Sequence, residues 1–518
     1  MPPSKTHPLV LFSLKPINQR AFDVLANPIN GHLVSIWGNG TRVLDIGHIH
    51  SISGNTTTLA TLGRNADIIV GGSSISRVQC SFEIDPDTNI VMLYDRSHSL
   101  STQVFGDDAM PFQYGRPRKV VVHQTVNTVI GMGGEKRDLV LFELHWYYDP
   151  ASAMEKVKDR QSAALEDNPR LARTIDEADT SLPSRRETRP HTSGPRQSQI
   201  RYTEIGEALG SGAFGTVHQV VDVDTGRLMA LKVLKFPPGE SERAALLNLV
   251  KREVEVLSRL NHPHIVDYIS FEGEPEVKIF MGLKQGTLHS LVENGVMSNQ
   301  LGETVLHQML QALDCLATED IIHRDIKPEN ILYVLQSSQY CFQLGDFGLS
   351  NRASIALTFA GSPIFMAPEI FQRGRRQTHK VDVWSLFVTM LWTLDISGFR
   401  QKSKRFSAFE DAPSAVLSVA AKVPDLQAMA SFNPEERASA AQMLIKCFKG
   451  VGLSTPRHLV PTLDNKATPL DQFRVRKARL PQTQPRSPVH RAASEKETSS
   501  LLLAATKTPQ VPGSFPNP

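Results

Sequence analysis

Residues 322–330 read I-H-R-D-I-K-P-E-N, and this stretch decides the interpretation of the chain. It brings a carboxylate, a cation and an amide close together. Asp325 can orient an attacking hydroxyl and accept its proton, Lys327 can offset the charge of a transferring phosphate, and Asn330 offers an oxygen to Mg²⁺. Because five letters are fixed at a set spacing, the stretch is a specific signal, and it predicts phosphoryl-transfer chemistry.

Two short motifs follow in the order that such a site needs. Asp346-Phe347-Gly348 comes after the strand-like run CFQLG and offers a second hard oxygen ligand for Mg²⁺. The residues A-P-E, 367–369, then close a loop of ordinary length. These motifs add a metal ligand and a loop boundary to the chemistry of residues 322–330.

An earlier glycine-rich segment, residues 210–215, reads G-S-G-A-F-G and follows a strand-like run. Glycines at this spacing let backbone N–H groups approach phosphate oxygens without interference from a Cβ atom. The pattern alone is weak, because dinucleotide-binding folds use the same spacing and flexible turns imitate it. It predicts a phosphate-binding turn only together with the other motifs.

The next two elements place a cation near that turn. Lys232 lies among apolar neighbours in the strand-like run MALKVL, where an unpaired ammonium would be costly. In the following helical stretch, Glu253 interrupts an apolar stripe that includes Leu246, Val250 and Leu257. A carboxylate on an inner face needs a cation, so we expect Lys232 and Glu253 to pair and to hold the lysine against ATP phosphates. Taken singly, the two residues would read as a snorkelling lysine and a surface glutamate.

In this order, the motifs resemble those of the eukaryotic protein kinase family, and the resemblance covers about half of the chain. It implies a bilobal α+β kinase fold over residues 202–450. It also implies transfer of the γ-phosphate of ATP, with Mg²⁺ as cofactor, to the hydroxyls of protein substrates. Lys327 and the G-S-P stretch at residues 361–363 imply Ser and Thr rather than Tyr, so the expected class is a non-specific serine/threonine protein kinase.

The resemblance implies a role for individual residues as well. The expected catalytic residues are Asp325, Lys327, Lys232 and Glu253. The expected ATP-binding residues are Leu209, Gly210, Gly212, Gly215, Val217, Lys232, Met281 and Leu283. The expected metal ligands are Asn330 and Asp346.

Packing within the kinase fold is also implied by the resemblance. Glu369 is expected to pair with Arg437, and Asp382 is expected to brace the catalytic loop. Phe280 is expected near the gatekeeper position, with residues 281–283 as the hinge.

Regulation is predicted by Arg324, the residue directly before Asp325. An arginine at this position can pair with a phosphorylated activation loop. Thr358, which precedes Gly361, is the expected phosphosite of that loop.

Residues 9–148 predict an all-β sandwich, because short alternating strands are separated by turns. In VQCSFEI, residues 78–84, apolar and polar side chains alternate as in a half-buried strand. The runs IVMLYD, KVVVH and LVLFELHWYY repeat this pattern at intervals typical of a sandwich.

Two loops of this region carry groups suited to phosphate. Arg64 follows Gly63 at the end of a strand, and Ser76 and Arg77 come some residues later. Guanidinium forks and hydroxyl donors at one end of a sandwich can make a phosphate receptor. On the residues alone, a turn at Gly63 and a capping role for Ser76 explain the same letters.

The G-R…S-R-x-x-C-x-F pattern resembles a forkhead-associated (FHA) domain, a reader of phosphothreonine peptides. The resemblance implies that Arg64, Ser76 and Arg77 contact phosphate and that phosphothreonine-containing proteins are partners. Two positions depart from the family pattern. Gln79 stands where the family usually has His, and residues 95–100 lack the Asn and Gly of its D-x-S-x-N-G element.

An FHA domain followed by a kinase resembles the checkpoint-type FHA kinases of the CAMK group and implies checkpoint or stress signalling. Those kinases usually carry clustered Ser-Gln and Thr-Gln pairs, whereas this chain has Ser198-Gln199 in the linker and Thr483-Gln484 in the tail. The alternative function is a phosphopeptide-binding scaffold with an inactive kinase fold. The complete set of catalytic residues favours the active enzyme.

The remaining segments are polar. Residues 149–201 and 451–518 are rich in Ser, Pro and charged residues, so we expect a flexible linker and a disordered C-terminal tail. The net charge of +3, from 56 basic and 53 acidic residues, is too balanced to predict direct binding of nucleic acid or membranes.

Cysteine usage and apolar runs bear on location. The four cysteines are far apart and contain no C-x-x-C pair, which indicates neither a disulfide framework nor a zinc site and favours a reducing compartment. No apolar run is long enough for a bilayer span or a signal-peptide core. We therefore expect an intracellular protein of the cytoplasm, the nucleus or both.

Overall fold

The computed structural model describes residues 7–134, 138–147, 199–212, 215–235, 239, 243–244, 247–248, 250–251, 254–255, 258–273, 276–347, 363–372, 377–406 and 411–463. Most of the predicted linker, residues 149–201, therefore lies outside the described residues, as does the predicted tail from residue 464 onward.

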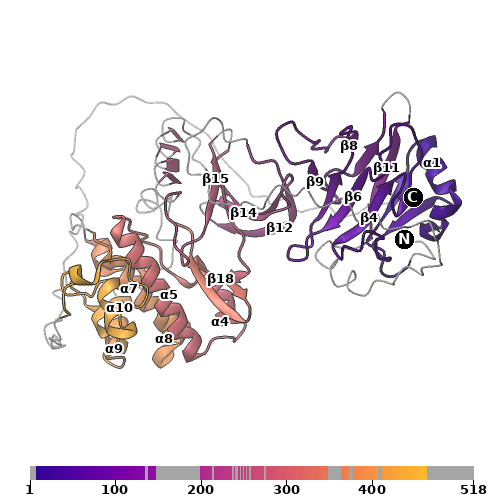
Figure 1. The fold of residues 1–518 in the computed structure, drawn as a ribbon. Helices are drawn as coiled ribbons and strands as arrows, with labels where there is room; N and C mark the ends of the chain where they lie inside the picture. Colours follow the sequence, from indigo (N-terminus) through magenta and orange to yellow (C-terminus); the bar gives the residue numbers. More distant parts are fainter. Residues whose placement is uncertain are drawn as a thin grey trace, which may run out of the picture. The chain divides into compact units, whose positions relative to one another are not determined.

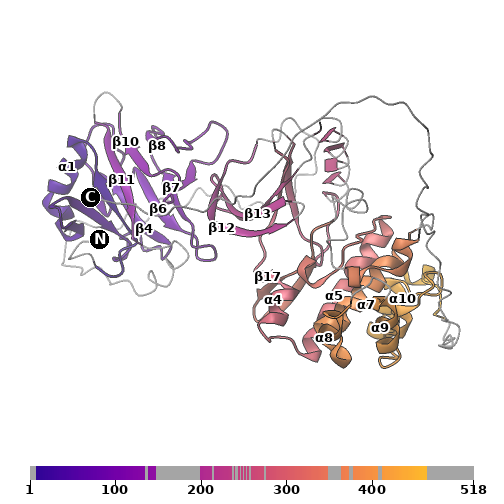
Figure 2. The ribbon, with the colours of Figure 1, turned by 180° about the vertical axis from the view of Figure 1, so that it is seen from behind.

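Two β-sheets form the N-terminal part of the chain, drawn in indigo to purple in Figures 1 and 2. Their strand orders are β2-β3-β1-β11-β10-β8 and β5-β4-β6-β7-β9. The strands are β1 Phe12–Pro16, β2 Val34–Ile36, β3 Arg42–Ile46, β4 Thr58–Gly63, β5 Ile68–Ile69, β6 Cys80–Ile84, β7 Val91–Asp95, β8 Thr102–Phe105, β9 Lys119–Val121, β10 Val129–Met132 and β11 Val140–Trp146. Phe12 of β1 meets Phe82 of β6 with ring centroids 5.1 Å apart, so side chains from both sheets share one core.

The strand pattern thus correctly predicted a β-rich region, but it missed one helix, α1 Gln19–Ala26. This helix begins after Asn18, whose side-chain oxygen accepts the N–H of Ala21. Only Ala21, Val24 and Leu25 of the helix are buried. A stripe this short leaves a weak periodic signal among strands.

The part of the chain after residue 199 begins with a five-stranded antiparallel sheet of order β12-β13-β14-β16-β15. Its strands are β12 Tyr202–Gly212, β13 Gly215–Asp222, β14 Leu228–Leu234, β15 Tyr268–Glu272 and β16 Lys278–Gly282. Helical pieces between β14 and β15 bury Val250 and Val254 against Ile279 of β16. Successive side chains of each strand point to opposite faces of this sheet, so one face meets these helical pieces and the other does not.

The second lobe is mainly helical and surrounds a small sheet of order β17-β18-β19. Its helices are α4 Leu288–Glu293, α5 Asn299–Thr318, α7 Lys380–Thr393, α8 Phe399–Ser403, α9 Asp411–Ala420 and α10 Ala440–Phe448. The small sheet consists of β17 Gly286–Thr287, β18 Ile331–Gln336 and β19 Gln339–Leu344, and 3₁₀ turns include Pro328–Asn330 and Arg457–Leu459. Figure 1 shows α5 and α7 running side by side in the middle of this lobe, where α7 is buried on nearly every face.

The C-terminal boundary of the lobe differs from the prediction. Residues 451–463 were expected to belong to a disordered tail, yet they are placed against the helical lobe. The backbone N–H groups of Ser454 and Thr455 donate to the buried carboxylate of Asp314 on α5. A carboxylate taken out of water needs such donors, and this requirement fixes the segment.

No helix in the described part of the chain combines the length and the apolar character that crossing a bilayer requires.

Candidate active site

The backbone of the loop that carries Asp325 is held by hydrogen bonds to Asp382 of α7. The Asp382 carboxylate accepts the backbone N–H of His323 at 2.8 Å and that of Arg324 at 2.7 Å. Burial raises the pKa of Asp382, while His323 and the two N–H donors act in the opposite direction. The expected bracing role of Asp382 agrees with these contacts, which fix the backbone directly before Asp325.

The side chain of Asp325 is oriented by two neighbours in its own loop. Lys327 Nζ donates to Asp325 Oδ2 at 2.9 Å, and Asn330 Nδ2 donates to the same oxygen at 2.8 Å. Asn330 Nδ2 also reaches the Asp325 carbonyl at 2.7 Å, so the amide oxygen is the group of Asn330 that remains for a cation. Both side-chain donors thus engage Oδ2 of Asp325, whose side chain is 29% exposed.

Backbone hydrogen bonds connect this loop to Asp346. Gly345 N donates to the Asn330 carbonyl at 2.9 Å, and the Gly345 carbonyl lies 3.0 Å from His323 Nε2. The His323 ring also contacts Phe347, with ring centroids 4.8 Å apart. Asp346 itself follows β19 and adopts a left-handed backbone with φ of 52°.

Lys232 of β14 forms an ion pair with Asp346. The lysine side chain is 10% exposed and the carboxylate 42% exposed, so the pair lies at the edge of the space between the lobes. A chain of contacts therefore runs from Lys232 through Asp346 and Gly345 to Asn330 and Asp325. Sequence reasoning expected Glu253 as the partner of Lys232, but Glu253 lies outside the described residues.

An apolar cavity of about 30 Å³ adjoins this ion pair. It is lined by Lys232, Asp346, Phe347 and Gly345 together with Val254, Ile265, Val266, Tyr268, Ile279 and Met281. Its size is too small for a nucleotide, but it shows which strand residues face the cleft. On β16 these are Ile279 and Met281.

The expected position of Phe280 near the gatekeeper is wrong. Phe280 is fully buried on the other face of the sheet, in a cluster with Val220, Met229 and Leu231. Its ring meets Tyr202 in an edge contact with centroids 5.2 Å apart. Because neighbouring residues of a strand point to opposite faces, Met281 is the residue beside the cleft. The strand ends at Gly282, and the connection to the second lobe follows it.

The glycine-rich residues lie on the β12–β13 hairpin. Gly210 pairs with Val217, and Gly212 pairs with Gly215. At Gly215 a Cβ atom would collide with the carbonyl oxygen of Val233 on β14, so this position needs glycine for close strand approach. Leu209 lies in β12 of this hairpin and is 53% exposed.

Comparison with known proteins agrees with this geometry. The family description "Protein kinase domain" matches residues 203–449. The Aurora kinase of Schizosaccharomyces pombe is 31% identical over 268 residues, which cover 49% of this chain and 74% of that protein. The chain belongs to the protein kinase family.

Other protein kinases are matched over smaller shares of their length. The serine/threonine-protein kinase BCK1/SLK1/SSP31 of Saccharomyces cerevisiae is 29% identical over 54% of this chain and 20% of its own. The ovarian-specific serine/threonine-protein kinase Lok of Drosophila melanogaster is 30% identical over 37% of this chain and 42% of its own. The chain thus spans less than half of these two relatives.

A buried ion pair of the kinase domain joins Glu369 to Arg437, as the family resemblance implies. The two guanidinium nitrogens Nη1 and Nη2 donate to Oε1 and Oε2 at 2.6 and 2.9 Å. Arg437 also donates to the carbonyl of Ser431 and lies over the Trp384 ring at 5.1 Å. The pair fastens the segment after the activation loop to the helical lobe.

Several predicted residues of the kinase domain cannot be placed. Glu253, Gly348, Gly361, Ser362 and the expected phosphosite Thr358 all lie outside the described residues. Leu283 is described and half-buried just after β16, and Val217 pairs with Lys232 in the sheet.

The N-terminal sandwich precedes the matched kinase domain. Arg64 and Arg77 are exposed, and neither forms an ion pair with another described residue. Their loops are joined by backbone bonds, since Arg64 N donates to the Ser76 carbonyl at 3.0 Å and Asn65 N to the Arg77 carbonyl at 2.9 Å. The structure therefore brings the three predicted phosphate-binding residues Arg64, Ser76 and Arg77 onto adjoining loops.

Gln79 supports these loops from inside the sandwich, a role that the sequence did not reveal. Its side-chain oxygen accepts the N–H of Ser76 at 2.9 Å. Its amide nitrogen donates to the hydroxyls of Ser101 and Thr102, both at 3.0 Å. A fully buried glutamine thus connects the loop of Ser76 to the start of β8.

The loop before β8 keeps a glycine-like backbone without a glycine. Leu100 has a φ of 52°, in the left-handed region, and its side chain is 54% exposed. Asp95 begins the loop by accepting the N–H and hydroxyl of Ser97, and Ser97 in turn accepts the N–H of Ser101. The position that departs from the FHA pattern at residue 100 therefore retains the conformation that favours Gly.

Proposed function

We propose that the chain is an ATP-dependent serine/threonine protein kinase that phosphorylates protein substrates. The observation that carries this proposal is the contact chain from Lys232 through Asp346 and Asn330 to Asp325. It gathers a cation, two metal-binding oxygens and a carboxylate around one cleft between two lobes.

Each of these residues has a part in the proposed reaction. The substrate hydroxyl oxygen attacks the γ-phosphorus of ATP, the bond to the β–γ bridging oxygen breaks, and ADP leaves. Asp325 orients the hydroxyl and takes up its proton, while Lys327 offsets negative charge on the transferring group. Lys232 binds the phosphates of ATP.

Magnesium fits the oxygens that remain at this site. The amide nitrogen of Asn330 is engaged by Asp325, which leaves Asn330 Oδ1, and Asp346 supplies a carboxylate. Hard oxygen donors of this kind suit Mg²⁺, which would neutralise charge on the phosphates when bound.

The proposed activity can be tested with Asp325→Asn in the full chain and a generic Ser/Thr peptide. Loss of the proton acceptor should lower kcat by about 100-fold or more, with the KM for ATP nearly unchanged. The matched control is Glu329→Gln, an exposed acid in the same loop, which should retain activity.

The outcome also separates the enzyme from the inactive scaffold. If wild type and Asp325→Asn give the same background phosphorylation, the kinase fold is idle and only a binding function remains. Asp346→Asn provides a second check, because it should abolish Mg²⁺-dependent transfer without touching Asp325.

Phosphorylation at Thr358 is the regulation that we propose for this activity. Arg324 Nε is buried and has no hydrogen-bond partner among the described residues. A buried guanidinium nitrogen without a partner is costly, and a phosphate on the activation loop would supply one. Thr358→Ala protein should show the low rate of unphosphorylated wild type, and equality with the phosphorylated form would refute the assignment.

A second proposed function, reading of phosphothreonine, is favoured by the loops of the sandwich. Arg64 and Arg77 are exposed and have no carboxylate partner among the described residues, and Ser76 lies between their loops, held by Gln79. Charge-assisted bonds from such groups are the usual means of binding phosphate. A reader joined to a kinase fits signalling of the checkpoint or stress type.

Binding of a fluorescent phosphothreonine peptide library tests the reader. Arg64→Ala should weaken binding by about tenfold or more, since a hydrogen bond to a charged group contributes about 1.5–3 kcal/mol. Arg20→Ala, which removes another exposed arginine from α1, is the matched control. Equal affinity of wild type and Arg64→Ala, or equal binding of the unphosphorylated peptides, would reduce the sandwich to a structural module.

A further inference from the structure

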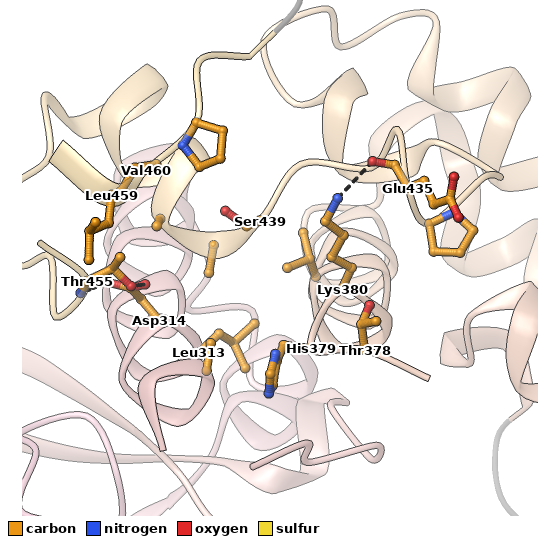
Figure 3. A pocket seen from close by; sticks show the side chains of 16 residues that line it. Leu313, Asp314, Thr378, His379, Lys380, Glu435, Ser439, Thr455, Leu459 and Val460 are labelled. Atoms are coloured by element: carbon orange, nitrogen blue, oxygen red, sulfur yellow. Dashed lines mark hydrogen bonds between the residues drawn. The ribbon is translucent and has the colours of Figure 1, made fainter. Parts of the chain in front are cut away.

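A cavity of about 660 Å³ lies in the helical lobe and contains none of the catalytic residues. Figure 3 shows its lining side chains around an open centre. Leu313, Asp314 and Ala317 come from α5, Lys380 and Val383 from α7, and residues 439–441 from the start of α10. The volume falls within the range of about 300–1,000 Å³ that is typical of small-molecule sites.

One wall of the cavity, formed by residues 455–461, is held in place by hydrogen bonds to Asp314. Asp314 is almost fully buried, and its Oδ1 accepts the hydroxyl of Thr455 at 2.6 Å. Its Oδ2 accepts the backbone N–H groups of Ser454 and Thr455 at 2.8 and 2.9 Å. These three bonds fix the segment that places Leu459 and Val460 along the cavity.

Among the described residues, several hydrogen-bond acceptors that line the cavity are engaged by the protein itself. All three donors to Asp314 come from residues 454–455. Ser439 Oγ accepts the N–H of Gln442 at 3.2 Å, as the cap of α10. Glu435 is an exposed residue, and its backbone carbonyl accepts a hydrogen bond from Lys380 Nζ. Apart from these groups the lining is mostly apolar.

Lys380 differs from these acceptors, because its ammonium is a positively charged donor. Its ammonium donates to the Glu435 carbonyl at 2.9 Å, drawn as a dashed line in Figure 3. Among the described residues it has no carboxylate within ion-pair distance. Burial and the nearby Arg437 lower the pKa of Lys380, and the more distant carboxylate of Glu435 opposes this shift only in part. On the same wall, His379 Nε2 lies 3.3 Å from Asp320 Oδ1.

We propose that this cavity binds a small amphipathic anion, a molecule with one apolar chain and a carboxylate head. The head pairs with Lys380, which retains N–H donors beyond the one given to Glu435. The chain lies against Leu313, Val383 and Val460, where it removes apolar surface from water. A cationic ligand would bring a second positive charge beside the ammonium of Lys380, which disfavours its binding.

Titration calorimetry on the full chain with dodecanoate, below its micelle concentration, tests the proposal. We expect saturable binding to one site, and affinity about fourfold lower for each methylene removed, in undecanoate and decanoate. Dodecyltrimethylammonium should not bind at the same concentrations. Absence of saturable binding, or equal binding of the cationic amphiphile, would overturn the proposal.

Two variants locate the site. Lys380→Met should weaken dodecanoate binding by about tenfold or more. Its matched control is Lys446→Met, because Lys446 also donates to a carbonyl, that of Pro424, yet does not line the cavity. Ala317→Leu should reduce binding by filling the cavity while Lys380 stays in place. Unchanged affinity in both Lys380→Met and Ala317→Leu would contradict the assignment.

Photolabelling gives a readout that does not depend on how well any variant folds. A fatty acid with a terminal diazirine should label peptides of wild type that contain residues 313–317, 380–383 or 455–461. Labelling confined to other peptides would show that the ligand binds elsewhere and would refute this site.

Discussion

At the scale of single residues, His48 is a buried histidine in the sandwich whose neighbours disfavour protonation. Its Nδ1 has no hydrogen-bond partner among the described residues. Burial lowers the pKa of His48 to about 4, and the nearby His7 and His32 act in the same direction. The folded sandwich therefore holds this ring neutral in a range where an unfolded chain protonates it.

This difference predicts acid sensitivity. Below pH 6.5 the unfolded state takes up a proton on His48, whereas the folded state stays neutral until about pH 4. Stability is therefore fully present above pH 6.5 and falls as the pH drops toward 4, by about 3 kcal/mol for this residue. Urea unfolding followed by tryptophan fluorescence should show a flatter pH dependence for His48→Gln than for wild type.

His50→Gln provides the control for this measurement. His50 lies in the same loop and is exposed, so its replacement should leave the pH dependence of the urea midpoint as in wild type. If His48→Gln and wild type lose stability in parallel between pH 6.5 and 4, the buried histidine is not the cause.

The site residues that the sequence predicted correctly are those of short motifs, because their spacing along the chain is fixed. Asp325, Lys327 and Asn330 are close in sequence, and the structure joins them through direct hydrogen bonds. The expected partner of Lys232, Glu253, lies outside the described residues, and in the described part of the chain a carboxylate distant in sequence, Asp346, pairs with the lysine. Such long-range choices depend on the positions of two lobes, which no local pattern encodes.

At the scale of elements, the ion pair of Glu369 and Arg437 fastens a turn to the helical lobe with almost no exposure to water. Glu369→Gln should leave the Arg437 charge buried and unpaired, which costs about 3–5 kcal/mol. We expect the melting temperature of the kinase domain in the full chain to fall by roughly 10 °C. Differential scanning calorimetry measures this directly.

An exposed pair offers the comparison. Arg259 and Glu255 lie one helical turn apart, and each is more than half exposed, so Glu255→Gln should change the melting temperature by about 2 °C or less. Equal shifts for the two variants would mean that burial of the first pair has no energetic consequence.

Strand and segment boundaries show where sequence reasoning failed. Phe280 was expected beside the cleft, before a hinge at residues 281–283, but its side chain lies on the other face of the sheet. A shift of one residue reverses every side chain of a strand, so parity depends on the neighbouring strands. Residues 451–463 precede the polar tail without a clear boundary in sequence, and long-range contacts, among them those to the buried carboxylate of Asp314, place them against the lobe.

At the scale of the whole molecule, all four cysteines are free. Burial raises the pKa of Cys80, Cys315, Cys341 and Cys447, which keeps the thiols protonated and slow to react. We predict four titratable thiols in urea without reductant, and a melting temperature that reductant changes by about 1 °C or less, whereas loss of a native disulfide typically costs about 2–5 kcal/mol. Fewer than four thiols in urea would reveal a disulfide.

The two-part organisation was predictable because each part has its own periodicity. Alternating short strands indicated the β-rich region, and ordered motifs indicated the kinase domain. The function of the sandwich depends instead on a few loop side chains, among them Gln79, whose three hydrogen bonds cannot be read from its neighbours in sequence.

The backbone of Leu100 has a practical consequence for protein engineering. A left-handed leucine costs about 1–2 kcal/mol that glycine does not lose, although glycine gives back part of the gain through greater freedom of the unfolded chain. The exposed leucine side chain contributes little packing to oppose the exchange. The substitution L100G should therefore raise the free energy of unfolding, although it removes a side chain. It would also expose less apolar surface to other molecules in concentrated solution.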